Sequence, residues 1–188
     1  GADFDSLSRN ADLAMYCSKD LGRARYSFYH AELDTSLRKR VELERELALA
    51  IERDELVLHF QPLIDAASGR TIGCEALVRW QHPLRGLLMP GTFIAAAEET
   101  GLIGALGAWT IQAACAQHAA WRRHGLAPVP VAVNVSALQV HDPMLADTVR
   151  SAMRQHGLGP GELELELTES TLLADTDAAL RTVERLRD

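Results

Sequence analysis

Residues 73–80, Gly73-Cys74-Glu75-Ala76-Leu77-Val78-Arg79-Trp80, alternate between two kinds of side chain. In an extended backbone, successive side chains point to opposite faces, so the odd-numbered and even-numbered residues form separate sets. The even set is apolar, whereas the odd set carries Glu75 and Arg79. The pattern predicts a β-strand, and taken alone it also fits an ordinary half-exposed antiparallel strand.

Two later segments repeat this design. Residues 129–136 place Asn134 opposite a row of valines, and residues 162–169 alternate leucines with glutamates, including Glu166. Helical patterns separate the segments, which indicates strand–helix units of a parallel sheet, and such folds build their sites at the C-terminal strand ends. We therefore expect Glu75, Asn134 and Glu166 to converge at one rim.

Two carboxylates and one amide carbonyl are hard oxygen donors. Such donors suit Mg²⁺ or Mn²⁺ better than zinc. The alternative is that these side chains are polar groups of a barrel interior that pair with lysine or arginine. Glu164 shares the same face, and we expect it to be a buried residue with a structural partner.

The overall composition limits the possible partners and the compartment. The chain has 188 residues, a net charge of −7 and a pI near 5.5, so no global basic field attracts a nucleic acid polymer. The three cysteines, Cys17, Cys74 and Cys115, are far apart and form no CxxC pair. This spacing argues against a disulfide framework or a zinc site and favours a reducing cytoplasm.

The run from Thr100 to Trp121 contains no Asp, Glu, Lys or Arg, and its length alone permits a membrane span. Polar residues interrupt it, and its apolar residues have helical spacing. We therefore expect a helix that packs on the barrel. The face expected to be apolar comprises Leu102, Leu106, Trp109, Ala113, Ala116 and Ala120.

The remaining patterns divide the chain into three parts. Residues 1–30 are predicted to be the tail of a preceding domain, with a helix over 11–16 and a strand over 24–28; residues 31–53 form a linker helix, and residues 54–188 carry the site. A short turn at 66–70 makes the strand over 56–64 antiparallel to the strand with Glu75. Further helices are predicted from Pro90, up to Arg123, over 142–156 and over 175–188.

Several of these motifs, in the same order, occur in a known family. Phe60-Gln61-Pro62-Leu63, Glu75-Ala76-Leu77-Val78-Arg79-Trp80, Asn134-Val135-Ser136 and Glu166-Leu167-Thr168-Glu169-Ser170 resemble the EAL domain of bacterial cyclic di-GMP phosphodiesterases. The resemblance covers roughly residues 35–188. Residues 11–29 resemble the C-terminal end of a GGDEF domain, without its signature, which implies a tandem GGDEF-EAL parent.

The resemblance implies an α/β fold, a (β/α)₈ TIM-type barrel with an antiparallel first strand, of which this chain holds about the first half. It implies hydrolysis of cyclic di-GMP to linear pGpG with two Mg²⁺ or Mn²⁺ ions bound by Glu75, Asn134 and Glu166. Glu75 and Glu169 are the implied catalytic residues, and Gln61, Leu77 and Arg79 the implied dinucleotide contacts. It further implies upstream GGDEF and sensor domains in cis and a homodimer through the EAL domain.

Two other readings remain open at this level. A silent EAL domain would bind cyclic di-GMP or a protein partner and signal without catalysis. A partial chain would have no function of its own, and from its length we expect the 188 residues alone to show no turnover. Upstream segments that anchor the parent to a membrane are also compatible with the sequence.

Overall fold

The computed structural model describes residues 3–4, 7–8, 10–11, 14–15, 26, 28–29, 31–167 and 176–187. The chain separates into two compact units, Gly1–Glu46 and Leu47–Asp188, and helix α2 (Ala31–Glu52) begins in the first and ends in the second. In the first unit, Tyr26 and Phe28 lie in irregular backbone rather than in the predicted strand. The rest of that strand and half of the helix predicted over 11–16 lie outside the described residues, whereas residues 11, 14 and 15 are helical.

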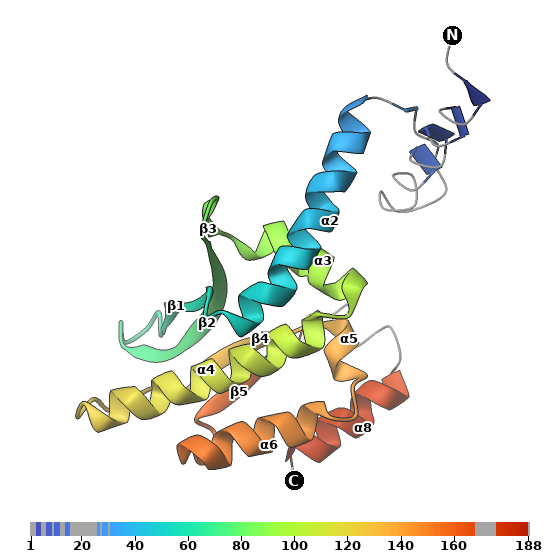
Figure 1. The fold of residues 1–188 in the computed structure, drawn as a ribbon. Coiled ribbons are helices and arrows are strands. Elements are labelled where there is room, and N and C mark those ends of the chain that lie inside the picture. The colour runs from blue at the N-terminus through green and yellow to red at the C-terminus, as the bar shows by residue number, and fades with distance from the viewer. Residues whose placement is uncertain are drawn as a thin grey trace. The chain divides into compact units, whose positions relative to one another are not determined.

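The second unit is built on a mixed sheet (Figure 1). Its strands are β1 (Leu56–Ile64), β2 (Thr71–His82), β3 (Gly86–Leu88), β4 (Val131–Val135) and β5 (Leu163–Leu167). The order is β1-β2-β4-β5, with β3 on β2. β1 and β2 are antiparallel, whereas β2, β4 and β5 are parallel. The predicted α/β class, with an antiparallel first strand in a partial barrel, is therefore confirmed.

In the part of this unit that the structure describes, five helices follow or connect these strands. They are α3 (Pro90–Thr100), α4 (Ile103–Arg123), α5 (Ala137–Val140), α6 (Leu145–His156) and α8 (Thr176–Arg187). α3 and α4 are separate because Gly101 adopts φ 77°, a left-handed conformation that glycine accepts without steric cost. The four longer helices match the prediction, whereas the single turn of α5 and the short strand β3 were not predicted.

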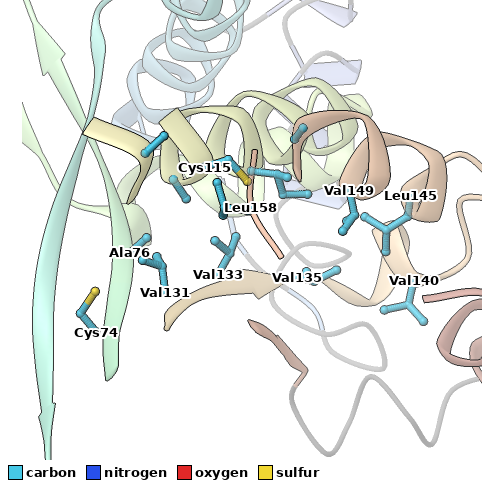
Figure 2. Close-up of a cluster of buried hydrophobic side chains, with 14 residues drawn as sticks. Cys74, Ala76, Cys115, Val131, Val133, Val135, Val140, Leu145, Val149 and Leu158 are labelled. Atoms are coloured by element: carbon cyan, nitrogen blue, oxygen red, sulfur yellow. The ribbon is translucent and has the colours of Figure 1, made fainter. Parts of the chain in front are cut away.

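The core lies between one face of the sheet and helices α4 and α6. The inward valines of β4, Val131, Val133 and Val135, pack with Cys115 of α4 and Val149 of α6 (Figure 2). Two cysteines of this core, Cys74 and Cys115, are free thiols. Within the described residues, no helix is long and apolar enough to cross a membrane.

The buried face of α4 differs from the predicted one. Only Leu106 of the predicted set is fully buried, and the stripe that faces inward contains Ile103, Leu106, Gly107, Thr110, Ile111, Ala114, Cys115, His118 and Ala119. The prediction failed because α4 contacts the sheet, α3, α5 and α6 at once, so no single apolar stripe marks the inside. Thr110 is tolerated there because its hydroxyl donates to the Leu106 carbonyl at 2.9 Å.

A cluster of polar contacts links the C-terminal end of α4 to the loop that precedes β5. Arg122 donates to Gly157 O at 3.0 Å and to Glu162 Oε1 at 2.7 Å, and Gly159 N donates to the other Glu162 oxygen at 2.6 Å. His118 is fully buried with its Nε2 4.0 Å from Glu162 Oε1. In the described part of the chain, neither ring nitrogen of His118 has a hydrogen-bond partner. The ring is therefore poorly placed to carry a charge.

This burial predicts a pH-dependent stability. Burial lowers the pKa of His118 below its ordinary 6.5, against the attraction of Glu162. Stability linked to His118 is then present above pH 6.5 and is lost as the pH falls towards the lower folded pKa, because the unfolded chain binds the proton more readily. We expect the free energy of unfolding, measured by urea denaturation, to fall as the pH is lowered below 6.5, and His118→Leu to remove that part of the fall.

The control is His124→Leu, since His124 is exposed and its Nδ1 lies 2.8 Å from its own helix carbonyl at Ala120. The titration of Glu162 does not affect this comparison. Its pKa is lowered, first by the Gly159 amide, so its contribution is lost only below the ordinary value of 4.5. A pH profile that is the same in wild type and in His118→Leu would contradict the prediction.

Candidate functional site

Three oxygen-bearing side chains from three parallel strands lie together. Asn134 and Glu166 are register partners on β4 and β5, and Glu75 of β2 lies opposite Ala132, two residues before Asn134. Asn134 Nδ2 donates to Glu75 Oε1 at 2.5 Å. Residues paired in this way project from the same sheet face. The structure therefore brings Glu75, Asn134 and Glu166 to one place, as the sequence predicted.

The position of Glu75 differs in one respect from the expectation. Asn134 and Glu166 are the penultimate residues of their strands, but Glu75 is the fifth of the twelve residues of β2. β2 pairs with β4 only over Cys74–Ala76 and then continues as an antiparallel partner of β1 and β3. Glu75 is thus the middle residue of the short parallel stretch of β2, one residue before that stretch ends.

The site is electrostatically unbalanced in favour of a cation. The pKa of Glu166 is raised above its ordinary value, first by burial and then by the negative charges of Glu75 and Glu164. Among the described residues, no lysine, arginine or histidine forms an ion pair with Glu75 or Glu166. The alternative of barrel carboxylates paired with basic side chains is therefore not realised in the described residues.

The donor set fits a hard divalent cation. Because the Asn134 Nδ2 group is engaged by Glu75, the amide oxygen is not consumed by that contact. Two carboxylates and a carbonyl oxygen then match the ligands of Mg²⁺ and Mn²⁺. The described residues contain no group of three or more His, Cys, Asp and Glu side chains placed around one metal position. In the candidate set, two donors are the carboxylates of Glu75 and Glu166, and the third is the amide oxygen of Asn134.

The residues predicted to contact a dinucleotide extend along β1 and β2. Gln61 is the antiparallel register partner of Glu75 and is exposed, so it lies beside the carboxylates. Leu77 and Arg79 follow on the same face of β2, and Arg79 lies about 13 Å along the strand from Glu75 at 3.3 Å per residue. The Arg79 Nη1 group donates to Val78 O at 2.9 Å. Its buried Nε has no partner in the described part of the structure.

The structure does not confirm the predictions for two further residues, Glu164 and Glu169. Glu164 is exposed rather than buried, because its face of β5 is the polar face of the sheet, opposite the helices that form the core. The prediction that Glu164 is a buried structural residue is therefore wrong. Glu169 lies in residues 168–175, outside the described residues, and its role stays a prediction.

Sequence reasoning missed a cavity beside the site. It has a volume of about 260 Å³ and lies between β2, β4 and helices α3, α4 and α5. Its walls are mostly apolar and include Leu77, Pro90, Ile94, Leu106, Gly107, Asn134, Ser136 and Gln139. The spacing of Ser136 and Gln139 is that of a capping box, S-x-x-Q, which was the available signal for the helical turn of α5.

The family follows from comparison with known proteins. The EAL domain family matches residues 44–188. The chain belongs to the EAL domain family. The resemblance inferred from the ordered motifs is therefore confirmed for this part of the chain, whereas the GGDEF-like character of residues 1–30 and the domain boundaries at 30 and 53 stay predictions.

Individual EAL proteins are similar over nearly the whole chain. An uncharacterised signalling protein of Caulobacter vibrioides is 46% identical over 187 residues, which are 100% of this chain and 23% of that protein. The bifunctional diguanylate cyclase/cyclic di-GMP phosphodiesterase MucR of Pseudomonas aeruginosa is 46% identical over 180 residues, 96% of this chain and 26% of MucR. The chain thus spans about a quarter of the length of these relatives.

A solved structure supports the same assignment. The PaMucR phosphodiesterase in complex with c-di-GMP superposes with a TM-score of 0.73 at 47% sequence identity. The superposition covers 78% of this chain and 59% of the PaMucR chain. The fold and the family of this EAL domain are therefore shown by sequence and by structure.

Proposed function

We propose that this EAL chain contributes the metal-binding rim of a phosphodiesterase that hydrolyses cyclic di-GMP to linear pGpG. The observation that carries the proposal is the contact of Asn134 with Glu75 beside Glu166, on three adjacent strands. The names of MucR and of the PaMucR complex support the choice of substrate.

Glu75, Asn134 and Glu166 would hold divalent ions, which we propose to be two Mg²⁺ or Mn²⁺. When bound, such ions neutralise a phosphodiester and lower the pKa of an attacking water. Without a cation, the same carboxylates repel an anionic substrate. Burial first, and then the negative charges of Glu75 and Glu164, raise the pKa of Glu166.

The other side chains of the face bind and orient the substrate in this proposal. Arg79 has a buried Nε without a partner in the described residues, and a guanidinium suits a phosphate oxygen geometrically. Gln61, beside Glu75, supplies neutral donors and acceptors next to the reacting phosphate. Leu77, between Glu75 and Arg79 on the same face and in the wall of the cavity, offers an apolar surface to a base. Glu169 supports catalysis from the segment after β5.

The context of this activity is also proposed. We infer upstream GGDEF and sensor domains in the same polypeptide. The name of MucR, a bifunctional diguanylate cyclase/cyclic di-GMP phosphodiesterase, supports a second catalytic activity in such a protein. We further propose a homodimer through the EAL domain and a cytoplasmic location. The location is supported by the free cysteines Cys74 and Cys115.

The test is hydrolysis of cyclic di-GMP by the full-length protein that carries this chain. With Mg²⁺ or Mn²⁺ we expect pGpG as the product by chromatography. Turnover should stop after the ions are removed with EDTA and return when Mn²⁺ is added, because the carboxylates alone supply no positive charge to the phosphodiester. Tight binding of cyclic di-GMP without any turnover at saturating Mn²⁺ would contradict the proposal and favour a receptor.

A further inference from the structure

Gln139 is a buried polar residue in the wall of the cavity that Asn134 also lines. It lies in α5 with 6% of its surface exposed, and its Oε1 accepts a hydrogen bond from the backbone N–H of Ser136 at 3.1 Å. Ser136 follows Asn134 by two residues, at the point where β4 ends and α5 begins. The Gln139 side chain therefore closes the turn that directly follows the amide ligand.

The position of the Gln139 side chain depends on Gly107 of helix α4. A Cβ atom at Gly107 of α4 would lie 1.7 Å from Gln139 Nε2 and 2.8 Å from its Cδ. These distances are far below van der Waals contact, so the Gln139 amide occupies space that is open only because residue 107 has no side chain. Gly107 and Gln139, far apart in the sequence, thus form one close contact between α4 and α5, the helical turn that follows β4.

Packing alone does not require an amide at this position. The neighbouring walls of the cavity are mostly apolar, and a buried amide is costly unless it is hydrogen-bonded. An aliphatic residue of the same length would fill the space at lower cost. The bond to Ser136 N–H is the feature that an aliphatic residue lacks, and this bond fixes backbone within two residues of Asn134.

We propose that Gln139, seated on Gly107, is a positioning residue that holds the end of β4 so that the Asn134 amide oxygen faces the cation site. The inference rests on the proposed function, because it assigns Asn134 to the metal site. It predicts that any change that displaces the Gln139 amide weakens metal binding, even when residues 75, 134 and 166 are unaltered. Substitutions of residues that orient a metal ligand without contacting the metal cost about 10-fold to 100-fold in metal affinity.

The experiment is a double-mutant cycle in the full-length protein. Gln139→Met removes the acceptor while keeping the length of the side chain, and Gly107→Ala pushes the amide away without changing Gln139. The control is Gly104→Ala, in the same helix, where an added Cβ meets no atom within 4 Å. The measurements are Mn²⁺ affinity in the absence of nucleotide, kcat and KM for cyclic di-GMP, and the midpoint of thermal unfolding.

We expect Gln139→Met and Gly107→Ala each to weaken Mn²⁺ binding by about 10-fold, with KM for cyclic di-GMP within about twofold of wild type at saturating Mn²⁺. The double variant should be no worse than either single variant, because both remove the same contact. Gly104→Ala should bind Mn²⁺ like the wild type.

Two results would overturn the inference while leaving the proposed function intact. The first is a Gln139→Met variant whose Mn²⁺ affinity is unchanged, whether its turnover equals that of the wild type or its unfolding midpoint is lowered. This result would show that Gln139 contributes to packing only. The other is full additivity of the two substitutions, which would make their effects independent. A wild-type protein that binds no Mn²⁺ and does not hydrolyse cyclic di-GMP would overturn both the function and the inference.

Discussion

Replacing Glu75 by alanine is expected to lower the hydrolysis of cyclic di-GMP by the full-length protein about a thousandfold. A bound divalent ion contributes several kcal/mol of charge stabilisation to a phosphodiester transition state, and each 1.36 kcal/mol corresponds to about tenfold in rate. Glu75 is also the acceptor that orients the Asn134 amide. Its loss therefore disturbs two of the three proposed ligands. The measurement is kcat/KM at fixed Mn²⁺.

Glu164→Gln is the matched control for this prediction. Glu164 is an exposed glutamate on β5, two residues before Glu166 and on the same face, but it is paired with Ala132 rather than with Asn134. Removing its charge lowers the repulsion that raises the pKa of Glu166. We expect activity within about fivefold of wild type, since a surface charge contributes little. Glu75→Ala with more than about a tenth of wild-type activity would contradict metal binding by Glu75.

Replacing Trp80 by alanine is expected to destabilise the EAL domain by about 3–5 kcal/mol, the usual cost of truncating a fully buried aromatic side chain. Trp80 is 0% exposed. Its ring packs edge-on against Phe93 at 5.8 Å and lies 5.0 Å from the ring of His82. Its Nε1 donates to Glu55 Oε2 at 3.1 Å, so truncation also removes a donor from that carboxylate. The measurement is urea denaturation followed by circular dichroism.

Trp80→Phe separates the two contributions of this residue. It keeps most of the buried aromatic surface and loses the bond to Glu55, for which we expect about 1–2 kcal/mol. A loss below about 1 kcal/mol for Trp80→Ala would show that the space closes without Trp80. It would contradict the view that this ring supports the hairpin of β1 and β2.

The prediction of the fold succeeded where the periodicity was strict. The alternation around Glu75, Asn134 and Glu166 identified three strands and the face that each glutamate or amide occupies, because a strand has only two faces. The short turn between β1 and β2 fixed their antiparallel pairing. The same alternation constrains the register seen in the structure, since a shift by one residue would turn the valines of β4 to solvent.

Other features depend on tertiary contacts that no local pattern encodes. The inward stripe of α4 was misjudged because Thr110 and His118 are polar by type but buried by the helices around them. Glu164 was expected to be buried because it shares the face of Glu166, which was predicted to point inward, whereas Glu164 is exposed in the structure. The fit of Gln139 against Gly107 joins two helices and is invisible in either segment alone. Such contacts require coordinates, since residue type fixes neither the neighbours nor the depth of a side chain.

The two kinds of strand pairing in this domain also differ in when they can form. β1 and β2 are neighbours in the sequence, and hairpins of that kind assemble in about 1–10 μs. The bond between Asn134 and Glu75 joins residues 59 positions apart, and closing so long a loop is slow until the intervening helices have condensed. We therefore expect the hairpin with Glu75 to form before β2 pairs with β4, and the cation affinity to arise only when β4 and β5 dock onto it.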